Sequence, residues 1–311
     1  MPQVIDALVI CTRNRERQIE DRLNELLQVA NLPPFVVIVD SSDSIKTEEV
    51  IRQASPQFFR AVITYVRSRP GLPHQRNVGI EWARKNVANL ELIHFLDDDI
   101  IPRMDYFTRI RKIFGDSPQV VAVGGYDSDL NRNQNAGVIR RLIGIGSKKC
   151  GVILQSGIAI PPHPQREIES CEWLVGGMQS VRVWIFDYAQ FDATLRMYGE
   201  DIDFYLRVRD LGEIVSSIHL PIKHLNDPSN RDSWREINLY HNGARWLLAQ
   251  RYPKRISPRR VIWTAIMLSL GETARYVRTR ECKYAQASKG NIEFLCRLFR
   301  NEPVVQVIQP E

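Results

Sequence analysis

Three adjacent aspartates, Asp97, Asp98 and Asp99, interrupt the largely apolar stretch IHFLDDDII at residues 93–101. Neighbouring carboxylates repel one another, and the burial of an unpaired charge is costly. Carboxylate oxygens are ligands that Mg²⁺ and Mn²⁺ prefer, so a divalent cation held at a strand end would neutralise these acids. A solvated acidic turn at the end of a strand is the alternative interpretation.

A second acidic cluster lies in YGEDIDFYLRVRDLG at residues 198–212, where a helix is predicted from about Asp201 with a C-terminal cap at Gly212. The helix dipole favours acids in the first turn, so capping explains part of this cluster. Glu200, Asp201 and Asp203 together exceed what capping requires. The excess leaves carboxylates that are free for chemistry.

The elements that must position these acids alternate along the chain. Strand-like stretches at residues 4–12, 33–43, 61–68 and 90–99 are separated by helix-like stretches at 17–30, 47–55 and 72–87. The strands are continuous apolar runs, which predicts an α/β fold with a parallel sheet covered by helices on both faces. Ligands of such sheets bind beyond the carboxyl ends of the strands. The segments CTRNR, DSSD and DDD all lie at those ends.

Several function classes fit this sequence poorly, even where they share the architecture. A dinucleotide-dependent oxidoreductase would carry Gly-x-Gly-x-x-Gly after its first strand, but the corresponding segment, CTRNRER, has no glycine. The five cysteines are scattered without a Cys-x-x-Cys pair, and no secretory signal is visible, which indicates reduced thiols in a cytoplasmic protein. Nucleic acid is not expected as a partner, because no known binding module occurs and the acidic trio would repel phosphate.

Six segments in order, spanning roughly residues 5–230, carry a family resemblance: VICTRNR, VVIVDSSD, GLPHQRNVGIEWA, HFLDDDI, VGGMQSVR and GEDIDFYLRVRDLG. The chain resembles a family 2 glycosyltransferase of the GT-A fold, of the bacterial polysaccharide or glycolipid type. The resemblance implies a Rossmann-like, mostly parallel sheet in residues 1–230. Nucleotide-sugar binding is expected at about 1–125 and the acceptor side at about 126–230, and a helical extension follows at 231–311.

The resemblance also implies roles for the acids. Asp97 and Asp99 form an Asp-x-Asp pair that holds Mg²⁺ or Mn²⁺, with the more direct contact at Asp99. On an extended strand, residues two apart point to the same side, so this pair could converge on one ion. Asp98 would point away or contact the donor sugar. His224 would complete the metal or diphosphate contacts, with His219 as its competitor.

For catalysis, the resemblance makes Asp201 the general base that removes the proton from the acceptor hydroxyl. Glu200 would help to bind the acceptor. One base, with a metal-bound leaving group on the opposite face of the sugar, describes a single displacement with inversion. Retaining chemistry would need a different arrangement, for which the sequence offers no candidate.

The remaining expected site residues bind the two substrates. We expect the nucleotide base and ribose to contact Thr12, Arg13 and Asp40. The diphosphate or ribose is expected to contact Arg76 and Asn77, since arginine suits phosphate. Ser41 stands where many relatives have a second acid that often contacts the base. The identity of the base is therefore open, and the donor could be a UDP, dTDP or GDP sugar. The acceptor side is expected at Trp173, Gly176 and Gly177, with an insertion at residues 129–152. A core role for Trp173 is the alternative.

The chain carries a net charge of +6, and the basic excess lies near its C-terminal end. Residues 231–300 hold 15 Lys or Arg against 5 Asp or Glu. The uncharged run at 261–271 has 11 residues, whereas a membrane-spanning helix needs about 20. Its arginine flanks suit a helix on an anionic membrane surface. Packing against the catalytic domain, or a homodimer through these helices, is the equally weighted alternative.

The sequence therefore predicts a metal-dependent, inverting glycosyltransferase that uses a nucleotide-diphosphate sugar and a saccharide or lipid-linked acceptor. It is expected in the cytoplasm, peripheral to the inner face of the membrane, in polysaccharide or glycolipid assembly. A catalytically degenerate sugar-binding relative and a Mg²⁺-dependent nucleotidyltransferase stay open as alternatives. The latter usually has a glycine-rich basic loop after its first strand, which is absent here.

Overall fold

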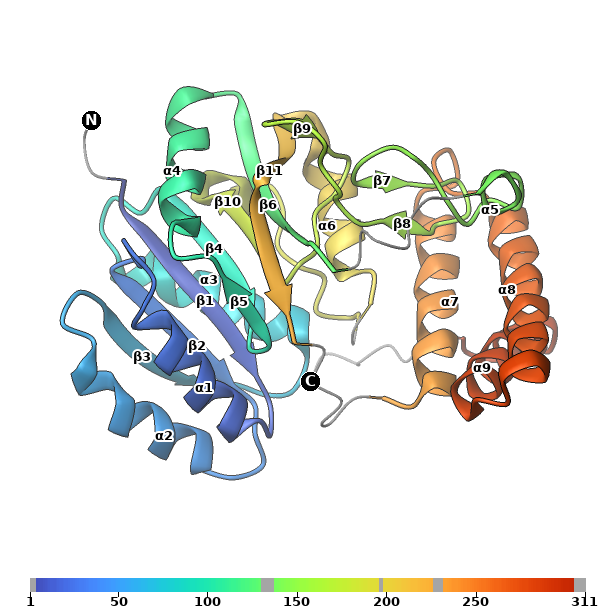
Figure 1. Cartoon of the computed structure of the whole chain (residues 1–311), viewed down its shortest axis with the longest axis horizontal. Coiled ribbons are helices and arrows are strands. Elements are labelled where there is room, and N and C mark those ends of the chain that lie inside the picture. Colours follow the sequence, from blue (N-terminus) through green and yellow to red (C-terminus); the bar gives the residue numbers. More distant parts are fainter. Residues whose placement is uncertain (1–3, 130–136, 196–197, 226–231, 305–311) are drawn as a thin grey trace.

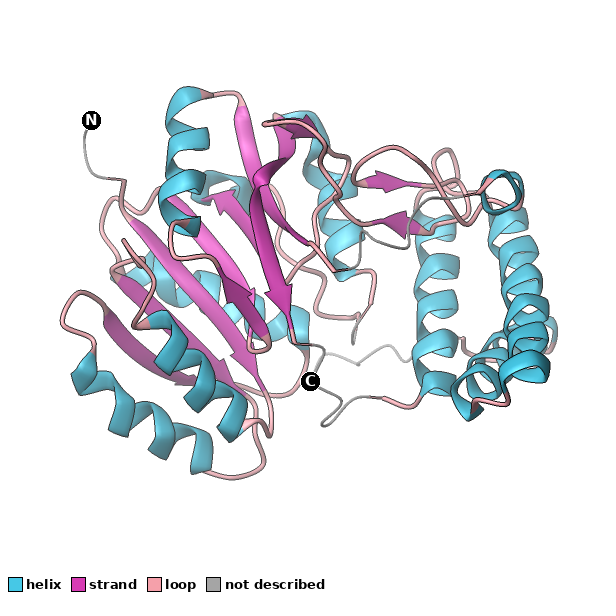
Figure 2. Cartoon of the chain, in the orientation of Figure 1, coloured by secondary structure: helices cyan, strands magenta, loops and turns pink. Residues whose placement is uncertain are grey.

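The structure is a computed structural model that describes residues 4–129, 137–195, 198–225 and 232–304. Within these residues a nine-stranded sheet has the order β3-β2-β1-β4-β10-β6-β11-β5, with β9 added beside β11 (Figure 1). Helices cover the sheet, and further helices form a separate group at one end of the molecule (Figure 2). The predicted α/β class is thus confirmed.

The N-terminal half of the sheet is parallel and in register, as predicted. It comprises β1 (Asp6–Thr12), β2 (Phe35–Asp40), β3 (Val62–Arg67) and β4 (Leu92–Asp97). Helices α1 (Glu16–Leu26) and α2 (Lys46–Ala54) pack on one face and α3 (Leu72–Asn86) on the other. Both faces are buried, so alternate residues of each strand enter different cores: Leu8 and Ile10 enter one, Ala7 and Val9 the other. This explains the continuous apolar runs in the sequence.

The second half of the sheet is mixed. Strand β10 (Met178–Arg182) lies antiparallel between β4 and β6 (Val120–Asp127), and β11 (Glu213–His224) continues beside β6. Helix α4 (Tyr106–Asp116) covers one face and α6 (Glu200–Val208) the other. Helix α6 begins one residue before the predicted start, and it ends four residues before Gly212 because a 3-10 turn (Arg209–Leu211) follows.

The strand predicted at residues 90–99 is shorter in the structure. Strand β4 ends at Asp97, Asp98 and Asp99 form a turn, and β5 (Ile100–Pro102) then pairs with the end of β11. The extended geometry expected for Asp97 and Asp99 is therefore wrong. The turn nevertheless keeps all three acids at the carboxyl edge of the sheet.

The remaining elements are short. They are α5 (Val138–Leu142), the hairpin β7 (Val152–Ile153) and β8 (Ala159–Ile160), β9 (Glu169–Ser170), and 3-10 turns at Ser55–Gln57 and Val183–Asp187. They include part of the insertion predicted at 129–152, of which residues 130–136 lie outside the described residues. In Figure 1 the β7–β8 hairpin extends from the sheet towards α7 and α8.

Three long helices form the C-terminal group: α7 (Trp234–Arg251), α8 (Pro258–Thr279) and α9 (Cys282–Phe299). Helix α7 starts with a capping box between Ser233 and Glu236, and α8 starts with Pro258 directly after Ser257. Leu239 and Leu248 of α7 belong to the same apolar core as α3 and α6. One side of the helical group is thus packed against the sheet domain. Among the described helices, none is long and apolar enough to cross a membrane.

Candidate active site

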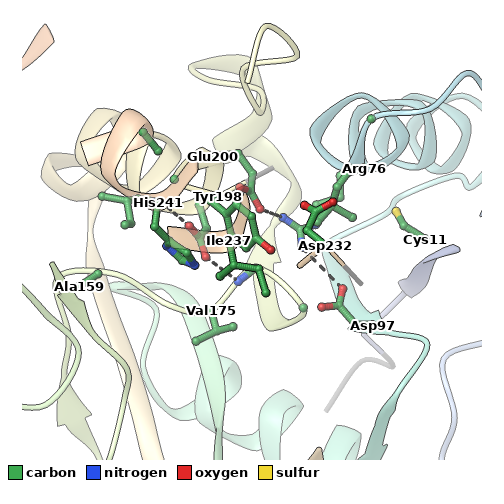
Figure 3. Close-up of a pocket in the computed structure, with 18 of the residues that line it drawn as sticks. Cys11, Arg76, Asp97, Ala159, Val175, Tyr198, Glu200, Asp232, Ile237 and His241 are labelled. Carbon is green, nitrogen blue, oxygen red and sulfur yellow. Dashed lines mark hydrogen bonds and ion pairs between the residues drawn. The ribbon is translucent and has the colours of Figure 1, made fainter. Parts of the chain in front are cut away.

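A cavity of about 1150 Å³ lies where the carboxyl ends of β1 and β4 meet the start of α6 and the inner face of α7. The three aspartates of the first acidic cluster line it together with Glu200 and Asp201 of the second, although about 100 residues separate the clusters in the sequence. Figure 3 shows Asp97 on one side of Arg76 and Glu200 on the other, with Tyr198, Ile237 and His241 further along the wall. The cavity thus joins a strand-end acidic site to a helical wall.

The three aspartates have different surroundings. The Asp97 side chain is 36% exposed and faces the cavity, whereas Asp98 and Asp99 are buried. Asp98 accepts hydrogen bonds from the Thr12 hydroxyl at 2.7 Å and from Arg15 at 2.5 Å. Burial raises the pKa of Asp98 to about 6, although Arg15 and Thr12 oppose this shift. Asp98 therefore anchors the loop after β1 to the acidic turn.

Asp99 is held beside the end of β11. Its carboxylate lies 3.1 Å from His224 Nε2, and its carbonyl accepts from the Leu225 amide. The other ring nitrogen of His224 lies 3.9 Å from Asp127 Oδ2, a buried oxygen without a hydrogen-bond partner among the described residues. His219 is exposed on β11 and does not line the cavity, so His224 is the better-placed histidine.

These side chains fit a substrate-completed metal site. No group of three or more His, Cys, Asp or Glu side chains in the described part of the chain is arranged as a metal cage. Mg²⁺, however, is usually held by one or two carboxylates together with substrate phosphates. Asp97, exposed in the cavity, and Asp99, paired with His224, match that mode.

Arg76 links the two acidic clusters. Its guanidinium lies 3.6 Å from Asp97 and donates to Glu200 at 2.9 Å, as Figure 3 shows. A Cβ added to Gly176 would lie 2.4 Å from Arg76 Nη1, and one added to Gly177 would lie 1.9 Å from Asp97 Oδ2. The two glycines therefore permit a close approach to Arg76 and Asp97. Their role in shaping the acceptor side stays a prediction.

Asp201 is partly buried at the start of α6, where it accepts from the Gly176 amide at 3.2 Å. Burial, together with the neighbouring Glu200 carboxylate, raises the pKa of Asp201 to about 7. The second oxygen of Glu200, Oε2, is buried and has no hydrogen-bond partner among the described groups. A carboxylate with a pKa near neutrality is suited to take up a proton during a reaction at physiological pH.

The predicted nucleotide contacts divide into two groups. Thr12 and Arg13 line the cavity, but Asp40 and Ser41 are buried and do not. The Ser41 amide donates to the Thr12 carbonyl, and Asp40 accepts from the Ser42 amide at 2.8 Å. Asp40 and Ser41 thus support the loop that faces the cavity.

Asn77 and Trp173 have structural contacts in place of those predicted. The Asn77 amide exchanges two hydrogen bonds with the backbone of Phe191, and Asn77 does not line the main cavity. It thus lies outside the cavity in which the predicted contact with the diphosphate or ribose would be made. Trp173 forms part of the cavity wall but is buried in the core, with its indole N–H donating to the Ile160 carbonyl at 3.0 Å. Its contacts favour the core alternative over stacking on a sugar.

Several site residues were not predicted from the sequence. Asp127 ends β6, so the reasoning that identified acids at other strand ends could have found it. Arg15 follows β1 closely but has no distinguishing spacing. One wall of the cavity comes from α7 and from residues 198–199, which precede α6. No sequence pattern indicated it, because only tertiary packing brings this wall to the acids. Its polar members are Tyr198, Trp234, Asn238, His241, Asn242 and Arg245.

Comparison with known proteins agrees with this architecture. The model of a family described as Glycosyl transferase family 2 matches residues 7–164. Mannosyltransferase PcManGT from Pyrobaculum calidifontis, solved with GDP-Man and Mn²⁺, is similar in structure at 15% identity with a TM-score of 0.59, over 94% of this chain and 87% of that chain. GalNAc-T7, solved with UDP, GalNAc and Mn²⁺, is similar at 12% identity and a TM-score of 0.58, over 97% of this chain and 59% of that chain. No curated protein matches the sequence. At these identities the structural likeness shows the fold, which is GT-A.

Proposed function

Because the chain belongs to glycosyl transferase family 2, we propose that it transfers a sugar from a nucleotide-diphosphate donor to a saccharide or lipid-linked saccharide. The observation that carries this proposal is the single cavity that joins Asp97 and Asp99 to Asp201. Structural neighbours solved with GDP-Man or UDP and with Mn²⁺ support a nucleotide-sugar donor and a divalent ion.

The donor end would use the strand-end residues. A divalent metal, when bound, would stabilise the negative charge on the leaving nucleoside diphosphate. Asp97, Asp99 and His224 would hold it. Thr12 and Arg13 would contact the nucleotide, while Asp98 fixes their loop through Thr12 and Arg15. Arg76 would keep Asp97 and Glu200 apart and partly neutralise both.

The acceptor end would use the start of α6. Asp201 would take the proton of the acceptor hydroxyl as that oxygen attacks the anomeric carbon, and the donor glycosidic bond would break with inversion. The Gly176 amide orients one Asp201 oxygen. Glu200, bound to Arg76, would position the acceptor. A degenerate relative would be expected to lack one of the acids, whereas Asp97, Asp99 and Asp201 are all present in one cavity.

Nucleotide binding provides the first test. We expect one of UDP, dTDP, GDP and CDP to bind with Mn²⁺ and to lose binding with EDTA, measured by calorimetric titration. Asp99→Ala should reduce Mn²⁺-dependent binding at least about 10-fold, because a ligand of the ion is removed. Asp210→Ala, whose side chain is 90% exposed, is the matched control. Absence of binding by every nucleotide in the presence of Mn²⁺ would contradict the proposal.

The outer face of α8 fits the proposed membrane association. Trp263, Leu270 and Val277 are seven residues apart, so they lie along one side of the helix, and they are 48%, 59% and 59% exposed. Exposed arginines occur near both ends of this stripe: Arg259, Arg260, Arg275 and Arg278. An apolar stripe with basic flanks is typical of a helix that lies on an anionic membrane surface. We therefore propose that the protein associates with the cytoplasmic inner face of the membrane.

Vesicle sedimentation tests this surface. We expect binding to vesicles that contain phosphatidylserine and little binding to pure phosphatidylcholine. Arg259→Gln with Arg260→Gln should weaken binding about 10-fold or more, since each basic residue near the surface contributes about 1 kcal/mol. Arg52→Gln with Arg60→Gln is the control, because both lie in or after α2, at the opposite end of the molecule (Figure 1). A dimer in solution without vesicle binding would show that another copy covers the stripe.

A further inference from the structure

The wall of the cavity formed by α7 contains a buried charge. Arg245 is 6% exposed, and it donates to the Ser156 carbonyl at 2.9 Å, to Asn242 Oδ1 at 2.7 Å and to the Thr264 hydroxyl. None of these acceptors is a carboxylate, and no ion pair of Arg245 occurs within the described ranges. Three of the five N–H donors of the guanidinium are used, which leaves two.

The hydrogen bonds of Arg245 also fix the amides beside it. Since a guanidinium only donates, the oxygen of Asn242 must face Arg245, and its Nδ2 must donate to Asn291 Oδ1 at 2.7 Å. The amide group of Asn291 is then oriented with its own Nδ2 as a free donor. That nitrogen is buried and has no hydrogen-bond partner in the described structure. Arg245, Asn242 and Asn291 all line the cavity.

This donor cluster belongs to the acceptor half of the cavity. Gly199, which precedes Glu200 and Asp201, packs on α7 so closely that an added Cβ would lie 3.1 Å from the Ala244 Cβ. The neighbouring His241 cannot offset the charge of Arg245, because a histidine side chain is either neutral or positive. Desolvation and then Arg245 lower the pKa of His241 to about 4, so it is neutral near pH 7. The carboxylates of the cavity come from the acidic turn, from the start of α6 and from Asp232.

We propose that Arg245 and Asn291 form a subsite for a compact anionic group of the acceptor, either a phosphate or a sugar carboxylate. This proposal rests on the proposed function and names its acceptor class. The anion would accept from the unused N–H groups of Arg245 and from Asn291 Nδ2. A forked guanidinium suits both kinds of oxyanion. A neutral saccharide would leave the buried charge without a counter-ion, which is costly.

Calorimetric titration of the full chain with inorganic phosphate, glucuronate and glucose tests the subsite. We expect at least one anion to bind at least 10-fold more tightly than neutral glucose, and Arg245→Met to abolish the difference. Arg52→Met, an exposed arginine on α2, should bind as the unchanged protein does. A preference for phosphate would identify a phosphorylated acceptor, and a preference for glucuronate an acidic sugar. Equal binding of all three probes would overturn the proposal.

Asn291→Asp keeps the test decisive if Arg245→Met does not fold. The new carboxylate is nearly isosteric and gives Arg245 an internal counter-ion, so the melting temperature should stay equal or rise. Binding of phosphate and glucuronate should fall to the level of glucose. Unchanged anion binding in Asn291→Asp would overturn the subsite. Nucleotide titration of the same samples with Mn²⁺ reports on the donor site separately, so its failure would count against the proposed function alone.

Discussion

Replacement of Asp201 by Asn is expected to lower the transfer rate by about 10²–10⁴-fold, the usual contribution of a general base. Asn has nearly the same shape and can keep the contact with the Gly176 amide, so the cavity should retain its form. What is lost is the carboxylate that takes the acceptor proton. Nucleotide binding with Mn²⁺ should therefore change little, while release of the nucleoside diphosphate in the presence of acceptor should nearly stop.

Asp203→Asn is the matched control on the same helix. Asp203 is buried, but it pairs with Arg207 at 2.9 Å and accepts from Tyr252 at 2.8 Å, and it does not line the cavity. Its replacement should lower the melting temperature and leave the rate per folded molecule largely unchanged. If Asp201→Asn transferred sugar as fast as the unchanged protein, the base would have to be another group.

The pH profile gives the same assignment an independent readout. Burial and the Glu200 charge place the pKa of Asp201 at about 7, and only the deprotonated form can accept a proton. The value of kcat/KM should therefore rise with pH and level off above about 7. If the rise of kcat/KM with pH reflects deprotonation of Asp201, it should be absent from the residual activity of Asp201→Asn. A rising limb that persists in the variant would assign it to a different group.

Local sequence patterns were sufficient for the parallel half of the sheet. Its strands are buried on both faces, so they appear as continuous apolar runs with polar segments at their carboxyl ends. The acidic trio was found because it lies at the end of such a strand, and the Glu200–Asp201 pair because it lies at the start of a predicted helix. Their union in one cavity depends on β10, which inserts between β4 and β6 and places the preceding Gly176 against Arg76 and Gly177 against Asp97.

The wrong or missing site residues have local and tertiary causes. Gln75 and Arg76 of α3 both line the cavity, whereas Asn77, the next residue around the helix, is held by the backbone of Phe191. Asp40 ends a strand as Asp97 does, yet its side chain turns under the following loop to hold Ser42. Arg245 and His241 lie in a helix about 40 residues after the acids, and no periodicity indicates that α7 closes the cavity.

A single methyl group at position 177 is expected to disable the donor site without unfolding the protein. In Gly177→Ala the new Cβ would lie 1.9 Å from Oδ2 and 2.1 Å from Cγ of Asp97. The backbone cannot withdraw, because the Asp97 amide donates to the Gly177 carbonyl at 3.0 Å at the junction of β4 and β10. The Asp97 side chain can rotate away, so the fold should survive while the carboxylate leaves its place. A misplacement of about 1 Å can cost about 10²-fold in rate, and we expect a loss at least that large.

Gly115→Ala isolates the steric effect from the general effect of removing a glycine. Gly115 lies in α4, where an added Cβ meets nothing within 4 Å, and alanine in a helix should stabilise the protein by up to about 1 kcal/mol. Transfer rate, Mn²⁺-dependent nucleotide titration and melting temperature should be measured for both variants. Loss of rate and nucleotide affinity in Gly177→Ala alone, at a near-normal melting temperature, would tie the function to the position of Asp97. Normal affinity and rate in Gly177→Ala would show that this carboxylate does not serve the donor site.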